Sequence, residues 1–415
     1  MTWGTGLALF GVLAGCGQAA AQTVGSSRGR VIEVPGLGAL SKSKHGYARV
    51  NSVSCASAGN CAGGGHYRGQ HAAQQGFVVV ERNGRWKAAT GVPGLAALNK
   101  GRFAGVQSVS CGSAGNCAAG GYYADADLQD SFGFVVSEKH GVWGKAKTFP
   151  AGQDGSVDSL SCTSAGNCLA GGTAGADYFS DFHGFVAQER NGRWGRATTV
   201  PGLAALNKGG SADVDSVSCT SRGNCVAGGD YAAKNGSTQG FVAVERNGAW
   251  ATAIPVPGLA ALNTGRNAQV NGVSCASAGS CVAGGYYAGL NAILQGFVAV
   301  ERNGRWGPAT SVPGLAALGK GGGQTQVLAV SCAPAGRCTV GGSYIDRSGH
   351  RQGFVATEDH GAWGKPIPFP GLAALNKRGS AEVGALSCRP PGACAAGGAY
   401  TDRSGHLQGF VTQGR

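Results

Sequence analysis

The chain has 415 residues, of which 77 are glycine and 15 are cysteine. The glycines follow no Gly-X-Y period, which excludes a collagen-like molecule, and 42% hydrophobic content is too high for a disordered chain. The net charge of +13 favours contact with anionic partners, although general solubility explains it equally well. After the first 22 residues no apolar run approaches the roughly 18 residues that span a bilayer.

The N-terminal segment looks like a targeting signal, because an apolar stretch from Leu7 to Ala14 is followed by small residues. A-A-A at 19–21 fits a signal peptidase site, whereas L-A-G-C at 13–16 looks like a bacterial lipobox that would lead to lipidation of Cys16. A third alternative is that Cys16 is an ordinary small residue. Residues 1–6 carry no Lys or Arg, which leaves a translation start further upstream open.

The remaining cysteines form C-x5-C pairs, and the first members of successive pairs are spaced 56, 51, 57, 56, 57 and 56 residues apart. A fixed period of this size indicates a solenoid or a propeller. The pairs are Cys55/Cys61, Cys111/Cys117, Cys162/Cys168, Cys219/Cys225, Cys275/Cys281, Cys332/Cys338 and Cys388/Cys394.

Each repeat predicts four strands in the same order. Examples of the first three are Val214–Cys219, Cys225–Tyr231 and Gly240–Arg246, and the fourth reads R-W-G-x-A-T as in Arg305–Thr310. Asn-Gly or His-Gly stands between the third and fourth strands, which predicts a tight hairpin turn with positive φ at both residues. Only the A-A-L-N segment after the fourth strand could form a helical turn.

The two ends of the chain complement each other. Residues 30–37 match a fourth strand and its exit loop, while the chain stops after a third strand at 409–412. The sequence therefore predicts an all-β, seven-bladed β-propeller of four antiparallel strands per blade, closed by an N-terminal outer strand that joins the last blade. We assign 1–21 to a signal peptide, 22–29 to a linker and 30–415 to a single domain.

We expect the fourteen paired cysteines to form disulfides within the hairpin of the first two strands, each worth about 2 kcal/mol. Zinc is a poor alternative, because each pair supplies two ligands without a repeated His and the number of pairs is odd. Free thiols are the remaining alternative. No metal or other cofactor is expected. Asp125, Asp127 and Asp130 loosely suggest calcium, but the twelve-residue calcium loop is missing.

Aromatic residues recur in three places. The Phe that follows a Gly in the third strand and the Trp of the fourth strand should pack between blades. A Glu near the end of the third strand in six repeats is expected to be part of the scaffold. A tyrosine at the end of the second strand could stack on a sugar or close the core with a hydroxyl in water. These tyrosines are Tyr67, Tyr123, Tyr231, Tyr287, Tyr344 and Tyr400.

Basic residues recur in the connections between repeats. In a propeller these connections emerge on one face, which would attract an anionic wall polymer, a glycan or a surface protein. The positions predicted to bind such a ligand are Lys100, Lys208, Lys320 and Lys377. Nucleic acid is not expected, because no aromatic-basic recognition motif accompanies the charge.

Catalysis has little support in the sequence, since no catalytic motif occurs and no residue can be picked as catalytic. The leading hypothesis is a non-enzymatic scaffold that binds a ligand through the basic face. A glycan hydrolase or lyase is the alternative, and would need clustered carboxylates or His in blades that depart from the consensus. Blades two and three depart most, because blade two exits through P-A-G at 150–152 without the L-A-A-L-N segment. A purely structural surface protein is the third hypothesis.

The string G-S-Y-I-D-R-S-G-H-R-Q-G-F-V at 342–355, followed by P-G-L at 370–372, resembles the bacterial extracellular HAF-type repeats. The S-C-x-S-x-G-x-C-x-A-G-G element is similar to secreted Cys-pair repeats of high-GC Gram-positive bacteria. The resemblance covers residues 30–415 and implies an extracellular propeller without a defined activity or catalytic residue. We therefore expect a monomer that is secreted, or attached only by a lipid anchor to the outer face of the cytoplasmic membrane.

Overall fold

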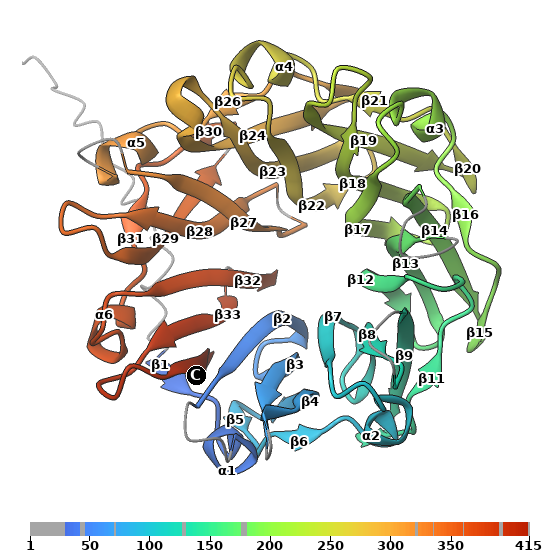
Figure 1. Cartoon of the computed structure of the whole chain (residues 1–415), viewed down its shortest axis with the longest axis vertical. Helices are drawn as coiled ribbons and strands as arrows, with labels where there is room; N and C mark the ends of the chain where they lie inside the picture. Colours follow the sequence, from blue (N-terminus) through green and yellow to red (C-terminus); the bar gives the residue numbers. More distant parts are fainter. Residues whose placement is uncertain are drawn as a thin grey trace, which may run out of the picture.

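The computed structural model describes residues 30–41, 46–69, 72–126, 130–175, 181–319, 323–334, 336–359, 361–389 and 393–413. The signal segment with Cys16, Asp127 and Lys320 lie outside these ranges. Seven antiparallel sheets are arranged in a ring around a central axis (Figure 1). The predicted all-β, seven-bladed propeller is confirmed.

Each blade contains three long strands, which lie side by side from the central axis outward. The innermost are β2 (Ala48–Ser57), β7 (Ala104–Ser113), β12 (Ser156–Ser164), β17 (Ala212–Ser221), β22 (Ala268–Ser277), β27 (Thr325–Cys332) and β32 (Ala381–Arg389). The second are β3 (Asn60–Arg68), β8 (Asn116–Ala124), β13 (Asn167–Ala174), β18 (Asn224–Ala232), β23 (Ser280–Ala288), β28 (Cys338–Ile345) and β33 (Ala393–Thr401). The third are β4 (Gln74–Arg82), β9 (Ser131–Lys139), β14 (His183–Arg190), β19 (Thr238–Arg246), β24 (Leu294–Arg302), β29 (Arg351–Asp359) and β34 (Leu407–Gln413).

The predicted fourth strand is broken into two short pieces in blades one to six, because a bend separates the Trp from the following residues. Both pieces pair with the third strand. They are β5 (Arg85–Trp86) and β6 (Thr90–Gly91), β10 (Val142–Trp143) and β11 (Lys147–Thr148), β15 (Arg193–Trp194) and β16 (Thr198–Thr199), β20 (Ala249–Trp250) and β21 (Ile254–Pro255), β25 (Arg305–Trp306) and β26 (Thr310–Ser311), and β30 (Ala362–Trp363) and β31 (Ile367–Pro368).

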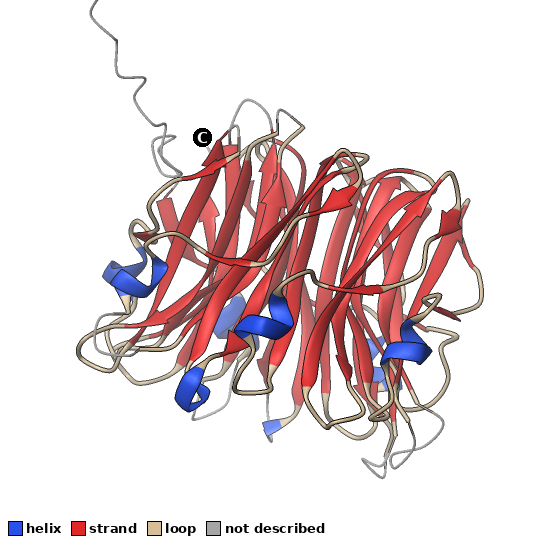
Figure 2. Cartoon of the chain, turned by 90° about the horizontal axis from the view of Figure 1, so that it is seen from above, coloured by secondary structure: helices blue, strands red, loops and turns tan. Residues whose placement is uncertain are grey.

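Single helical turns follow the outer strands, as the A-A-L-N pattern allowed. They are α1 (Leu37–Leu40), α2 (Leu95–Leu98), α3 (Leu203–Leu206), α4 (Leu259–Leu262), α5 (Leu315–Leu318) and α6 (Leu372–Leu375), and a 3-10 turn spans Leu290–Ala292. In side view these turns gather toward one face of the disc (Figure 2). The connection from blade two to blade three, at 150–155, has no such turn.

The ring closes as the chain ends predicted. Strand β1 (Arg30–Glu33) pairs antiparallel with β34, with Arg30 opposite Gln413 and Glu33 opposite Phe410. The last blade thus obtains its outer strand from the other end of the chain. A closed ring leaves no unpaired sheet edge between blades, which removes a site of aggregation.

All seven predicted cysteine pairs form disulfides, with Cα–Cα distances of 3.9–4.0 Å. Each bridge lies at the end of the hairpin between the first and second strands. Disulfides in this number are typical of proteins that fold in an oxidising compartment. The bridges are Cys55–Cys61, Cys111–Cys117, Cys162–Cys168, Cys219–Cys225, Cys275–Cys281, Cys332–Cys338 and Cys388–Cys394.

The tight turn between the third and fourth strands has the predicted geometry. In blade four Asn247 and Gly248 have φ of 51° and 82°. Positive φ at both central residues matches the twist of the two strands that the turn connects. The repeated Asn-Gly therefore has a local, structural reason.

Blades pack on each other through a repeated core. The Phe of each third strand is almost fully buried, as at Phe241 and Phe297, among valines of the neighbouring sheets. The facing strand is built from Gly because a Cβ at Gly284 would approach Val327 to 2.7 Å. This close packing explains the repeated A-G-G of the second strand.

A ring of serine hydrogen bonds ties each innermost strand to the next. The serine before the first cysteine accepts the backbone N–H of the first cysteine in the following blade, at 2.8–3.1 Å. For example, Ser274 accepts from Cys332 N, and Ser387 accepts from Cys55 N across the ring closure. All seven junctions share this bond, so it is part of the scaffold.

Candidate functional site

The innermost strands change register near their first residues. In blade five the pairing shifts between Val270 and Gly272, which leaves Asn271 as an extra residue. The opposite second-strand residue must be Gly, because a Cβ at Gly285 would lie 1.9 Å from the carbonyl oxygen of Gln269. Bulges of this kind are common next to functional sites, where they redirect a side chain.

Three positions in each blade vary around this irregularity, although the adjacent valine is the same in all seven. We call them the axial mouth. The residues before the valine are Arg49, Gly105, Ser156, Asp213, Gln269, Gln326 and Glu382. Their second-strand partners are His66, Tyr122, Thr173, Asp230, Tyr286, Ser343 and Ala399. The residues after the valine are Asn51, Gln107, Asp158, Asp215, Asn271, Leu328 and Gly384.

Four carboxyl groups from blades three and four gather on one wall of the mouth, which we call the acid wall: Asp158, Asp213, Asp215 and Asp230. The Thr173 hydroxyl hydrogen-bonds to Asp213 and lies 3.4 Å from Oδ2 of Asp158. The Ser156 hydroxyl donates to the same Asp158 oxygen at 2.8 Å.

Burial raises the pKa values of carboxyl groups in the acid wall. It raises the pKa of Asp158 and of Asp230 to about 7 in each, and the neighbouring Asp213 adds to both shifts. The pKa of Asp215 is raised well above its usual value by burial and then by Asp230. Part of this wall is therefore protonated at neutral pH, and can donate as well as accept hydrogen bonds.

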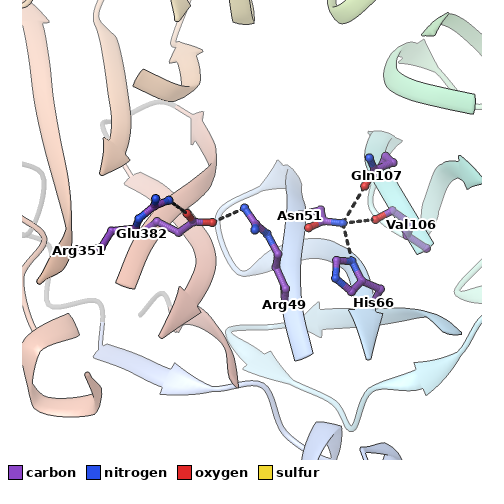
Figure 3. A network of polar contacts seen from close by, with 7 residues as sticks. All are labelled: Arg49, Asn51, His66, Val106, Gln107, Arg351 and Glu382. Carbon is purple, nitrogen blue, oxygen red and sulfur yellow. Dashed lines mark hydrogen bonds and ion pairs between the residues drawn. The ribbon is translucent and has the colours of Figure 1, made fainter. Parts of the chain in front are cut away.

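The opposite wall carries arginine, from blades one, six and seven. Figure 3 shows Glu382 between Arg49 and Arg351. Glu382 is buried, whereas the two arginine side chains are 34% and 41% exposed, so guanidinium groups remain accessible beside the ion pairs. We call Arg49, Arg351 and Glu382 the arginine wall.

Asn51 joins blade one to blade two at the mouth (Figure 3). Its amide donates to the carbonyl of Val106 at 2.8 Å and to Gln107 Oε1 at 2.9 Å, and lies 3.2 Å from Nδ1 of His66. Burial, assisted by Arg49, lowers the pKa of His66 to about 4. The imidazole is therefore neutral at physiological pH.

The tyrosines predicted to bind ligand lie one residue beyond the mouth positions, and they point between blades. Tyr123, Tyr231, Tyr287, Tyr344 and Tyr400 are 3–8% exposed, and Tyr67 is partly buried. The hydroxyls of Tyr123 and Tyr287 bond Thr148 and Ser311 of the outer strands. The structure does not bring these tyrosines together at the axial mouth, and as ligand residues they stay a prediction.

The predicted cysteines belong to the scaffold and not to the axial mouth. Cys61 in β3 and Cys394 in β33 are bonded to Cys55 and Cys388, at the hairpin end of their blades. The mouth residues lie at the other end of the same strands, as His66 does in β3. Cys61 and Cys394 therefore contribute structure to the blades on either side of the ring closure, and they bring no reactive thiol to a binding site.

The predicted lysines lie on the same face as the mouth, but at its rim. Lys100, Lys208 and Lys377 are exposed, and each follows by two residues one of the helical turns α2, α3 and α6, which lie at the outside of the disc (Figure 1). As ligand residues they stay a prediction.

Three of the repeated glutamates are paired between blades, in keeping with the scaffold role expected from the sequence. Arginines at the end of the third strand in one blade pair with the glutamates of the next: Arg82 with Glu138, Arg246 with Glu301, and Arg302 with Glu358. Within the described ranges, no group of three or more His, Cys, Asp or Glu side chains is arranged to hold a metal ion.

The site residues predicted from the sequence did not include the axial mouth. Those predicted residues, such as the tyrosines, recur in the repeats, whereas the mouth consists of positions that differ between repeats. Aligning the seven repeats would have exposed them, because they flank a valine that never changes. What could not be read from the repeats is that blades three and four place their carboxyl groups together.

No family model matches the chain, and no curated protein matches it. Among solved structures it is similar to a GH74 xyloglucanase from Xanthomonas campestris, with a TM-score of 0.51 and 13% identity over 92% of this chain and 55% of that one. A protein of unknown function from Dyadobacter fermentans gives 0.48 and 10%, covering 93% and 98%. The β-propeller domain of the trilobed protease from Pyrococcus furiosus gives 0.49 and 7%, covering 90% and 94%. These similarities show the fold alone.

The resemblance to HAF-type repeats stays a prediction. No helix in the described part of the chain has both the length and the apolar character needed to cross a membrane.

Proposed function

We propose that this protein binds an acid-bearing glycan at the axial mouth. The observation that carries the proposal is the location of the variable positions: the framework repeats seven times, yet the set of three mouth residues is different in every blade. Variable residues on a rigid scaffold are where binding specificity usually lies.

The chemistry of the mouth favours a polyhydroxylated ligand that also carries an anionic group. Partly protonated carboxyl groups on the acid wall suit sugar hydroxyls, which both donate and accept. The guanidinium groups of Arg49 and Arg351 suit a carboxylate or phosphate. Tyr122 and Tyr286 supply aromatic surface between the two walls. In this proposal the exposed rim lysines attract an anionic polymer at longer range.

In the same proposal the mature protein is a secreted or lipid-anchored bacterial surface protein. A wall polymer or a surface glycan would then be the natural ligand. Mass spectrometry of the mature N-terminus tests the anchor, since a diacylglyceryl group on Cys16 identifies a lipoprotein and cleavage after residue 21 excludes one.

Binding is tested with an array of acidic and neutral glycans and wall polymers on the oxidised protein. Asp213→Asn with Asp230→Asn alters the acid wall, Arg49→Gln alters the arginine wall, and Lys100→Gln is the rim control. We expect each wall variant to weaken binding at least tenfold, and the rim variant to change mainly its salt dependence. Absence of binding to every glycan, or wall variants that fold and bind like the wild type, would refute the proposal.

Glycan cleavage is the second candidate, and the acid wall is the observation that favours it. A carboxylic acid with a pKa near 7 can protonate a leaving oxygen. Burial raises the pKa of Asp213 as well, although the hydrogen bond from the Thr173 hydroxyl opposes that shift, and in its ionised form Asp213 could activate water. Incubation of bound glycans with the protein, followed by chromatography of the products, separates the two candidates. Shortened chains that disappear with Asp230→Asn would establish cleavage.

A further inference from the structure

A groove between blades two and three lies on the face opposite the axial mouth, where the cysteine hairpins and the Asn-Gly turns emerge. Its volume is about 880 Å³. The corresponding junction between blades five and six encloses about 210 Å³, and that between blades four and five about 10 Å³. The groove between blades two and three is therefore several times larger than the spaces at these two corresponding junctions.

At the junctions between blades four and five and between blades five and six, an arginine reaches the glutamate of the next blade. Arg246 reaches from the end of β19 to Glu301 of the next blade at 3.1 Å, and Arg302 reaches Glu358 at 3.8 Å. The guanidinium also covers the following turn, since a Cβ at Gly304 would lie 2.6 Å from Arg246. Both the volume and the charge of the junction are satisfied from within the chain.

Blade two lacks this arginine. Lys139 stands at its position, and Ser137 replaces the valine found at Val244 and Val300. A Cβ added at Gly192, in the turn of blade three, would meet no atom within 4 Å. Two smaller side chains thus leave the groove open.

Glu189 lies in this groove without a bonded partner. It is 3% exposed, yet no hydrogen bond or ion pair joins its carboxylate to another described residue, in contrast to Glu301 and Glu358. Burial raises the pKa of Glu189, and the positive charge of Lys139 offsets only part of that shift. A buried carboxylate in this state is costly unless something from outside the chain bonds to it. The groove therefore has an unfilled hydrogen-bond acceptor in its lining.

The rest of the lining shows what would fit. Trp194 offers an aromatic surface, and the exposed Lys139, Lys145 and Lys147 surround the opening with positive charge. A sugar ring stacks on an indole, its hydroxyls donate to a carboxylate, and an acid substituent pairs with lysine. A simple cation would satisfy Glu189 but would be repelled by the three lysines.

We propose that the groove between blades two and three is a binding site for an acidic oligosaccharide of the uronate type. Sugar hydroxyls bond Glu189, the ring packs on Trp194 and the carboxylates face the lysines. This site is independent of the axial mouth and does not rest on the function proposed for it.

The chain itself supplies the test variant. Ser137→Val with Lys139→Arg copies the sequence of the closed junction at Val244 and Arg246. It should fill the groove and restore an ion pair to Glu189, so the fold is kept or stabilised. Calorimetric titration with trigalacturonate is expected to show binding to the wild type and at least tenfold weaker binding to this variant and to Glu189→Gln.

Controls separate this site from the mouth. Asp230→Asn should leave trigalacturonate binding at the groove unchanged, and maltotriose should bind much more weakly because it lacks carboxylates. The reverse exchange, Val244→Ser with Arg246→Lys, is expected to create a second site. The proposal is overturned if the filled variant binds trigalacturonate like the wild type, if Asp230→Asn alone abolishes binding, if the wild type does not bind, or if argininamide binds in preference.

Discussion

The framework between blades and the axial mouth follow opposite rules. In the framework each blade presents the same Phe, the same Gly-Gly and the same serine to its neighbour, and all seven serine bonds are present. In the mouth, only a few residues away, Asp213 and Glu382 occupy equivalent positions with entirely different partners. This difference indicates that packing between blades restricts which residue type can occupy a position, because every blade meets the same neighbour. A side chain at the axial mouth has no such fixed neighbour.

The largest expected effect comes from breaking the framework at its core. Phe297→Ala removes a fully buried ring from the junction of blades four and five, and should lower the free energy of unfolding by about 3–5 kcal/mol. Urea denaturation measures the loss. The matched mouth variant Gln326→Ala, whose side chain has no partner among the described residues, should change stability by less than about 0.5 kcal/mol. Equal losses of stability in the two variants would contradict the distinction between the framework and the mouth.

A disulfide is the next strongest framework element. Replacing Cys275 and Cys281 together by Ala removes a bridge that spans a sequence separation of 6. Loss of this short ring should cost about 2 kcal/mol through the entropy of the unfolded chain. The same denaturation experiment applies, with the wild type under oxidising conditions as reference. An unchanged midpoint would mean that the hairpin needs no bridge.

The acid wall should make stability depend on pH. The folded-state pKa of Asp230 is raised to about 7, so the stability present below its unfolded pKa is lost as the pH rises through 7. Asp230→Asn should therefore stabilise the protein by about 2 kcal/mol at pH 8 and hardly at all at pH 4. Melting temperatures across this range measure it. A gain that is equal at both pH values would show that Asp230 is ionised in the fold.

His66 should make stability depend on pH in the opposite direction to Asp230. Its folded pKa is lowered to about 4, so stability is lost as the pH falls from about 6.5 toward 4. His66→Gln should remove this acid-side loss and leave the alkaline side unchanged, which provides the control for Asp230→Asn. A variant that changes both sides would indicate a general rearrangement of the mouth.

The smallest expected effect concerns one bond of the serine ring. Ser274→Ala leaves the backbone N–H of Cys332 without its acceptor, and should cost about 1 kcal/mol. Ser277→Ala, in the same hairpin but exposed, is the control and should be neutral. If both variants are neutral, the ring of hydrogen bonds adds nothing to the packing of the blades.

Local sequence patterns were sufficient to predict the architecture. The spacing of the cysteine pairs predicted seven blades, Asn-Gly predicted the hairpin turns, and Arg30–Glu33 predicted the closing strand. Each of these rests on residues close in the chain or on the repeat itself. The break in the outer strand was not predicted, because nothing in R-W-G-x-A-T marks the bend.

The axial mouth and the groove depended on contacts between repeats. Arg49 and Glu382 are 333 residues apart and meet only because the ring closes. The exchange of arginine for Lys139 is visible in the sequence, but only the packed junction turns it into a groove with an unpaired Glu189. The sequence by itself determined the blade, because a strand and its turn are set by neighbouring residues. Tertiary structure decided which side chains meet, because closure of the ring places distant repeats next to each other around one central axis.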